Sequence, residues 1–281
     1  MSILDSILQH EAELRLGVFA GLLLVLALAE RAWPARGDAR PARRQASNLA
    51  LVLIDTGLLR VAFPVLAAAL AMQVHARGGG LFGALDWPLW VEIGVAVVLF
   101  DLAIYWQHRL MHVVPLLWPL HRVHHSDTAF DVTTGIRFHP LEIALSMGIK
   151  LGLVLVLGPH AAAVILSEVL LSAASLFTHA DFALPARVDR ALRKLIVTPS
   201  MHRIHHSVLR RETDSNYGFN LSLWDRLFGS YRALPERPER EMPIGLEQWR
   251  DPAALGLGAL LLQPFRRPPA VAPPREDPVD A

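Results

Sequence analysis

The chain has 281 residues, of which 53% are hydrophobic, and its mean hydropathy is +0.34. This composition excludes an ordinary soluble domain, and the length allows one large domain or two small ones. The formal net charge of +1 gives no sign of a nucleic-acid partner, and the absence of cysteine excludes disulfides, Fe–S clusters and cysteine-ligated zinc or haem.

The N-terminal region, residues 1–86, is predicted to hold membrane helices and a basic loop. Leu16 to Ala29 is an apolar run of marginal length for a membrane span, which needs about 20 residues. The residues before it are acidic rather than basic, so we predict an anchor and not a cleaved signal peptide. A second apolar stretch, Leu49 to Val74, is interrupted by charges and a proline, and forms either one helix or two shorter pieces. Within it Asp55 and Arg60 are expected to pair, because charges in a membrane segment are costly without a partner.

Three further apolar segments follow. Trp87 to Tyr105 predicts a span that continues directly into the first histidines, and Leu141 to Gly158 with Ala161 to Phe177 predicts a hairpin that is either spanning or partly re-entrant. The arginine-rich loop at residues 36–44 should be cytoplasmic by the positive-inside rule. All the clustered histidines then lie on the cytoplasmic face. Three other histidines fall on the opposite side: His10, His75 and His160.

The remainder of the chain is predicted to lie outside the membrane. Pro185 to Arg232 is polar and arginine-rich, which indicates a cytoplasmic cap that contacts anionic headgroups. Residues 236–281 form a C-terminal extension, in which Pro264 to Ala281 is expected to be a disordered tail. The predicted fold class is therefore all-α: an integral membrane helical bundle with a cytoplasmic helical cap carrying a histidine-rich dimetal site, and with its catalytic core at residues 87–235.

Histidines in three clusters have the spacing of metal ligands: HRLMH, HRVHH and a distant HRIHH. Side chains three and four residues apart share one face of a helix. HxxxH therefore aims two imidazoles at one point, and HxxHH aims its first and last histidines together and sets the middle one to the side. Imidazole binds Zn, Cu, Fe and Ni, so ligand type leaves the metal open. The eight predicted catalytic ligands are His108, His112, His121, His124, His125, His202, His205 and His206.

Other residues could complete this site. His139 and His179 lie at the two feet of the predicted hairpin, and we expect both to join the ligands, for a set of ten. Carboxylates that accept a hydrogen bond from a ligand ring would orient it, and Asp127 and Glu142 are the favoured candidates. Five further carboxylates are candidates with capping or surface roles as the alternative: Asp101, Asp131, Asp181, Asp214 and Asp225.

The combination of HxxxH, HxxHH and a distant HxxHH resembles the fatty acid hydroxylase / sterol desaturase superfamily, whose members are membrane-bound, histidine-rich di-iron oxygenases. The resemblance runs from about Asp101 to Tyr231 and includes HRVHHSD (121–127), RFHPLE (137–142) and LSLWDRLFGSY (221–231). It implies two Fe ions, O2 as co-substrate, and an oxidised C–H bond in a lipid, sterol or isoprenoid-type substrate.

We therefore predict an O2-dependent di-iron hydroxylase or desaturase, with hydroxylation preferred, in the bacterial inner membrane. A lipid-like substrate would enter sideways from the bilayer. An external electron donor is expected, because the chain has no haem motif and no glycine-rich flavin or nicotinamide fingerprint. The alternative is a non-redox membrane metal-binding protein, such as a zinc hydrolase or a metal carrier. No HExxH occurs, which disfavours the hydrolase, and the ligands cluster beyond helix ends rather than at mid-membrane, which disfavours the carrier. A structural membrane protein with a degenerate site is a third possibility.

Overall fold

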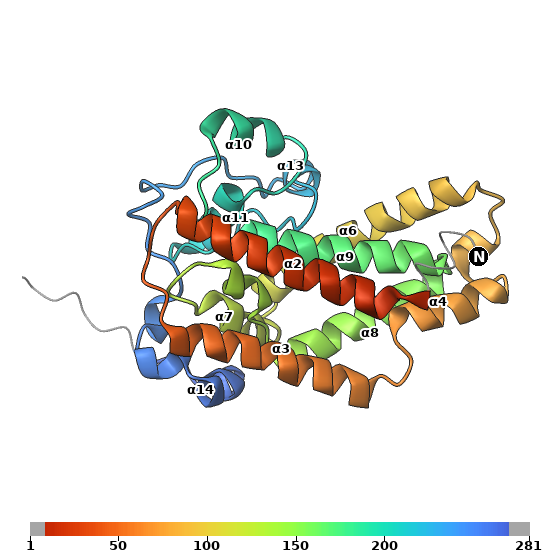
Figure 1. Ribbon diagram of the computed structural model, residues 1–281, viewed down its shortest axis with the longest axis horizontal. Coiled ribbons are helices and arrows are strands. Elements are labelled where there is room, and N and C mark those ends of the chain that lie inside the picture. The colour runs from red at the N-terminus through yellow and green to blue at the C-terminus, as the bar shows by residue number, and fades with distance from the viewer. Residues whose placement is uncertain (1–8, 270–281) are drawn as a thin grey trace, which may run out of the picture.

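The computed structural model describes residues 9–269, and these form a bundle of long helices with a smaller cap at one end (Figure 1). Five helical regions are long and apolar enough to cross a membrane. They are α2 (Glu11–Ala32), residues 42–83, α6 (Leu89–Val113), α8 (Pro140–Leu157) and α9 (Ala161–His179). The described residues contain no strand beyond isolated bridges. The predicted all-α membrane bundle is therefore confirmed, whereas its orientation in the membrane stays a prediction.

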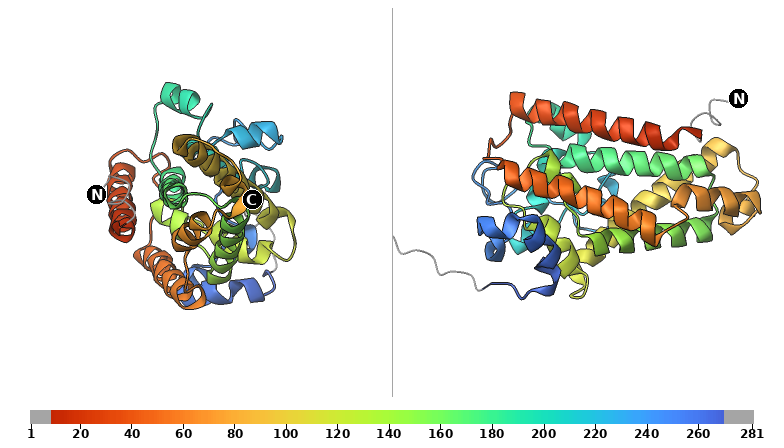
Figure 2. Two further views of the ribbon diagram at one scale, coloured as in Figure 1. Left: turned by 90° about the vertical axis from the view of Figure 1, so that its right-hand side faces the viewer. Right: turned by 60° about the horizontal axis from the view of Figure 1, so that its bottom comes forward.

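Helix α2 lies on the outside of the bundle (Figure 2). Only 6% of its most apolar window is buried inside the protein. Its 22 residues would extend about 33 Å, which is enough for the roughly 30 Å hydrocarbon core of a bilayer. Acidic residues occupy its first turn and Arg31 its last, the arrangement that the helix dipole favours. The helix is thus built to face lipid along most of its length.

The second apolar stretch is two pieces, which confirms one of the two alternatives. Helix α3 (Ala42–Ala62) ends just before Pro64, α4 (Ala67–Ala76) follows, and the short α5 (Gly80–Gly83) completes the region. Proline lacks a backbone N–H and disfavours helical geometry in the residue before it. The predicted pairing of Asp55 with Arg60 is wrong, because Asp55 is buried and Arg60 is exposed. Five residues place side chains about 140° apart around a helix, so the two groups cannot meet.

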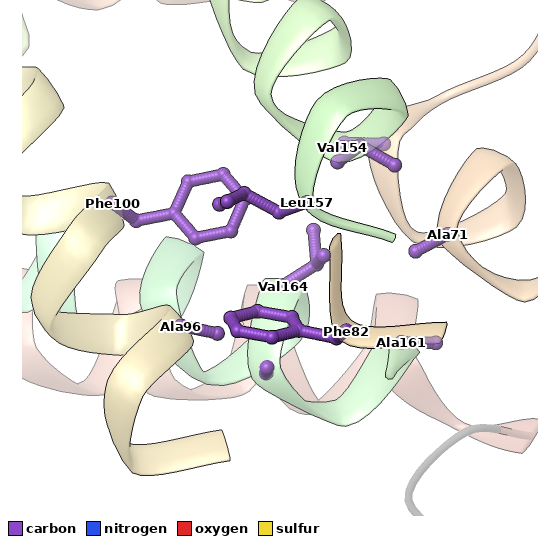
Figure 3. Close-up of a cluster of buried hydrophobic side chains, with 10 residues drawn as sticks. Ala71, Phe82, Ala96, Phe100, Val154, Leu157, Ala161 and Val164 are labelled. Atoms are coloured by element: carbon purple, nitrogen blue, oxygen red, sulfur yellow. The ribbon is translucent and has the colours of Figure 1, made fainter. Parts of the chain in front are cut away.

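The turn between α8 and α9 packs tightly against the loop before α5. Gly158 has a left-handed backbone with φ of 62°, and a Cβ there would lie 1.9 Å from the carbonyl oxygen of Gly79. Only glycine allows this approach. Beside it, at the end of the bundle away from the cap, a cluster of buried hydrophobic side chains joins α4, α5, α6, α8 and α9 (Figure 3). Phe82, Phe100 and Leu157 are its largest members.

The cap is made of short helices that follow the long helices α6 and α9 in the chain. The elements before residue 236 are α7 (Trp118–His125), η1 (Val132–Ile136), α10 (Ala186–Leu192), α11 (Pro199–His205), α12 (Arg210–Thr213) and α13 (Leu223–Leu227). The C-terminal extension adds η2 (Glu247–Trp249), η3 (Pro252–Leu255), α14 (Leu257–Leu262) and η4 (Gln263–Phe265).

The C-terminal extension packs back onto the bundle. Leu260 in α14 is fully buried against Leu51 and Val123. The Arg122 guanidinium donates to the backbone carbonyls of Gln263 and Arg266, the latter at 2.6 Å. The predicted disordered tail therefore begins later than Pro264, because the chain up to Arg266 is held by these contacts. The rest of that prediction, residues 270–281, falls outside the described residues.

Part of the basic loop is internal rather than solvated. The Arg44 guanidinium is completely buried and lies 2.5 Å from Asp127 and 2.6 Å from Asp131. It also donates to the hydroxyl of Thr134. Arg40 lies 3.1 Å from the buried Asp181 carboxylate. Both arginines thus connect the N-terminal helices to the histidine-bearing part of the chain, so they carry less weight as indicators of membrane orientation than the sequence pattern suggested.

Candidate metal centre

Nine buried histidines meet where the bundle joins the cap. Helix α6 runs toward the cap and carries His108 and His112 in its last two turns, and α9 ends on His179. The HxxHH motifs occupy α7 and α11, with His206 as the C-terminal cap of α11. None of these nine side chains is more than 4% exposed. The three clusters therefore assemble at one end of the molecule, as the sequence predicted.

The histidines form two groups, each able to hold a metal ion. The first contains His108, His112, His121, His125 and His205, and the second contains His124, His179, His202 and His206. Within each group the candidate ligand atoms all lie within 4.8 Å of one another.

The motif geometry explains the division. In α7 the outer pair, His121 and His125, joins the first group, while the middle residue His124 joins the second. In α11 the outer pair joins the second group, while the middle residue His205 crosses to the first. HxxHH was predicted to set its middle histidine to the side. In the structure this middle histidine joins the other group, so each motif contributes residues to both groups.

Within each group, the Nε2 atoms have no hydrogen-bond partner other than Nε2 atoms of the same group. In the first group the five Nε2 atoms are buried and have no hydrogen-bond partner. In the second, Nε2 of His179 lies 3.1 Å from that of His124, 3.2 Å from that of His206 and 3.0 Å from that of His202. Nitrogens at right angles around a metal, each at about 2.1 Å from it, would be about 3.0 Å apart. Convergent imidazole nitrogens that meet no protein group except one another fit a pair of metal ions.

The opposite nitrogen, Nδ1, is anchored in several of the rings, whereas in His112, His202 and His206 it has no hydrogen-bond partner. Nδ1 of His121 lies 2.7 Å from Oε1 of Glu142, which is itself buried. Nδ1 of His108 lies 2.7 Å from the Tyr217 carbonyl oxygen. Nδ1 of His205 lies at the same distance from the Ser215 carbonyl oxygen. Oxygen acceptors at Nδ1 keep the proton there and leave Nε2 bare for a metal. The carbonyl anchors could not be predicted from sequence, because every residue has a carbonyl.

Burial keeps the cap histidines neutral. Burial, together with the neighbouring His121, lowers the pKa of His205 to about 3. Burial and the nearby His206 likewise hold the pKa of His125 well below its ordinary value, and burial with His179 does the same for His202. A neutral imidazole is the form that binds metal. The rings are therefore available as ligands at physiological pH.

The tenth predicted ligand, His139, does not reach either group, which corrects the sequence-based expectation. Its ring caps the start of α8, where Nδ1 accepts from the Leu141 backbone N–H at 3.2 Å. Its Nε2 lies 3.2 Å from the Leu261 carbonyl oxygen. Both ring nitrogens are thus engaged with backbone. His75 and His160, expected on the opposite side, lie together at the far end of the bundle with ring centroids 5.2 Å apart.

The two favoured carboxylates have different roles. Glu142 orients His121, as expected. The expectation for Asp127 is corrected: its carboxylate contacts Arg44 and Arg137 and no histidine. Burial raises the pKa of Asp127, but the two guanidiniums outweigh this effect and hold that pKa below its ordinary value. Asp127 therefore fixes the loop that follows α7.

Most of the other five carboxylates accept hydrogen bonds from backbone N–H groups. Asp101 accepts from the Trp224 indole at 2.8 Å and from the Leu221 backbone N–H at 3.2 Å, and so attaches the cap to α6. Asp225 accepts backbone N–H groups, as does Asp181. Asp131 caps η1. Asp214 is the nearest of the five to a ligand ring, with Oδ1 at 3.5 Å from Nδ1 of His112.

A cavity of about 290 Å³ opens beside the first group and extends between the membrane helices. Its lining includes His108 and His121, and Phe19 on α2 and Leu59 on α3 contribute apolar walls. Helices α3, α6, α8 and α9 all contribute residues to it. Its most notable polar member is Asp55, which the sequence marked only as a charge in a membrane segment.

The fold and the site define a membrane-embedded helical protein with two groups of histidines that could each hold a metal ion and a largely apolar cavity beside them. The family model for fatty acid hydroxylase matches residues 93–230. This range contains all nine converging histidines. The chain belongs to the fatty acid hydroxylase / sterol desaturase superfamily.

Relatives of the chain oxidise lipids, by their names. It is 27% identical to ornithine lipid hydroxylase OlsE of Rhizobium tropici over 89% of this chain and 75% of that protein. It is 30% identical to methylsterol monooxygenase 2-2 of Arabidopsis thaliana over 64% of this chain and 70% of the relative. It is 34% identical to human alkylglycerol monooxygenase over 49% of this chain, but spans only 30% of that longer protein. No solved structure matches the chain.

Proposed function

We propose that this protein is a membrane-bound di-iron oxygenase that hydroxylates a C–H bond of a lipid, using O2 and external electrons. The observation that carries the proposal is the position of the cavity, whose lining includes two histidines of the first group and which lies among the membrane helices. The names of the relatives support a lipid or sterol as the substrate class.

The residues of this chain would perform distinct tasks. The nine imidazole Nε2 atoms would hold the two ions, and bound iron would supply the activation of O2 and the oxidation of the C–H bond. Glu142 and the carbonyls of Tyr217 and Ser215 keep the ligand rings in the binding orientation. Ile136 and Phe138, which line the cavity beside the histidines, exclude water and direct an apolar substrate toward the ligands.

Comparison of lipids from cells with and without the protein, grown under ¹⁸O2, tests this proposal. We expect one lipid class to gain a labelled oxygen atom, and the gain to be absent in a His108→Ala variant that still inserts into membranes. A product that loses two hydrogens and carries no label would replace hydroxylation by desaturation. No change in any lipid, from a protein shown to contain two iron ions, would contradict an oxygenase and favour the non-redox alternative.

The electrons would come from a separate donor, because the histidine groups are the only redox-capable site that we identify in the described residues. Purified, iron-loaded protein should make no more than a single turnover's product with lipid and O2, and a chemical or enzymatic reductant should restore multiple turnover. Sustained turnover without reductant would contradict this part of the proposal.

The histidine end is proposed to face the cytoplasm. The chain has no cysteine, so single cysteines can be introduced cleanly. Arg77 and Lys194 are both exposed cations, one after α4 at the far end and one after α10 in the cap. An impermeant maleimide should label the Arg77→Cys variant in intact cells and the Lys194→Cys variant only after permeabilisation. The opposite pattern would place the site outside.

A further inference from the structure

The cavity lining contains a buried carboxylate for which no described residue supplies a hydrogen bond or an ion pair. Asp55 on α3 lines the cavity and is 7% exposed. Its Oδ1 is buried without a hydrogen-bond partner, and no ion pair reaches the carboxylate from any described residue. A charged or strongly polar group is costly in a membrane interior unless it is paired. Asp55 therefore differs from the other carboxylates near the site, each of which holds a backbone group, a ring or a guanidinium.

The charges around the cavity do not supply a partner. Glu142, on the adjacent α8, lines the same cavity and is bonded to His121. The lining includes one lysine and no arginine among the described residues, and this lysine, Lys150, lies 2.5 Å from the Glu168 carboxylate. Glu168 also pairs with Arg15 at 2.8 Å. The part of the cavity near Asp55 thus has carboxylates without a free cation.

The position of Asp55 indicates what it contacts. It shares the cavity lining with His108 and His121, so an occupant that approaches the first group lies within the same space. It also lies outside residues 93–230, the part that the family model matches. The carboxylate is therefore a feature of the N-terminal helices of this chain, placed where it can select among lipids without holding a metal.

We propose that Asp55 accepts a hydrogen bond from a donor group on the lipid substrate, a hydroxyl or a protonated amine, close to the carbon that is oxidised. The proposal rests on the proposed function, because it takes the occupant of the cavity to be the substrate. It narrows the substrate class from lipids in general to lipids with such a donor. A lipid that lacks the donor would leave the Asp55 carboxyl group buried and unpaired, and the free-energy cost of this would weaken the binding of that lipid.

Binding can be measured without turnover, so a failure here is distinct from a failure of the oxygenase proposal. We would use native mass spectrometry of the purified full chain in detergent with three probes that share one chain length: hexadecylamine, hexadecanol and hexadecyl methyl ether. The wild-type protein should retain the amine and the alcohol more tightly than the ether by about tenfold, the effect of one hydrogen bond.

Two substitutions separate the two donors. In Asp55→Leu the preference over the ether should disappear, while retained ether binding shows that the cavity is intact. Asp55→Asn keeps an acceptor oxygen without charge, so it should lose the preference for the amine and keep that for the alcohol. Asp86→Asn, at an exposed loop position, is the matched control and should behave as wild type. Equal retention of all three probes by the wild-type protein, or a preference that survives in Asp55→Leu, would overturn the proposal.

Discussion

Glu142 provides the sharpest test of the metal centre, because it contacts one ring of one group. Its Oε1 lies 2.7 Å from Nδ1 of His121, and the side chain is buried. Removing a carboxylate that orients a ligand ring typically weakens metal binding about 10- to 100-fold, or about 1.4 to 2.7 kcal/mol. We expect Glu142→Gln near the lower value, since its amide oxygen still accepts. Glu142→Leu should approach the upper value, because the Nδ1–H is then buried without an acceptor.

The effect should be confined to the first group, which contains His121. Protein purified from iron-replete cells would be dialysed against graded chelator and its metal measured by mass spectrometry. The wild type should retain two ions over a range of chelator in which Glu142→Leu retains one. Glu92→Gln is the matched control, because Glu92 is also a buried carboxylate but lies at the far end of the bundle, where it accepts from the His160 backbone N–H. Loss of both ions in parallel, or no loss, would refute the division into two groups.

Three further outcomes are expected. His179→Ala should lower the metal content measured by mass spectrometry, whereas His139→Ala should leave it unchanged; equal effects would contradict the nine-histidine set. Arg44→Leu should destabilise the protein by about 3 to 5 kcal/mol, because two buried carboxylates lose their partner, and chemical denaturation in detergent should show no comparable loss for exposed Arg43→Leu. Metal-stripped protein should lose stability as pH falls from about 6.5 toward 3, since the unfolded chain then binds protons that buried rings such as His205 exclude; a flat stability between pH 7.5 and 5 would contradict the burial argument.

The sequence predicted the ligands that depend on helical spacing, but it could not separate the true candidate from the false one at the helix ends. The division of α7 and α11 between two groups follows from the positions of residues three and four apart. His139 and His179 both stand alone at the feet of one hairpin, and spacing cannot separate them. Their difference lies in which end of a helix they occupy: His139 precedes Pro140, a residue favoured at the first turn, and so takes the capping position.

The burial and the partners of the charged side chains were the features least predictable from the sequence. Arg44 lies in an arginine-rich loop, a pattern that favours a solvated surface, yet it is one of the most buried side chains of the protein. Its partners Asp127 and Asp131 are more than 80 residues away in sequence, so only the tertiary fold brings them together. The same limit applies to Asp55, whose expected partner was on its own helix but on a different face.

The crossing of the two HxxHH motifs has a consequence for how the protein matures. Each metal position takes ligands from both α7 and α11, and these helices are separated by some 70 residues that include the whole α8–α9 hairpin. Neither position can exist before the hairpin has folded and returned the chain to the same end of the bundle. The first ion to bind would cross-link the two helices and thereby preassemble the second position. Both positions should therefore load metal only after the hairpin has folded, and an ion bound at one position should speed the assembly of the other.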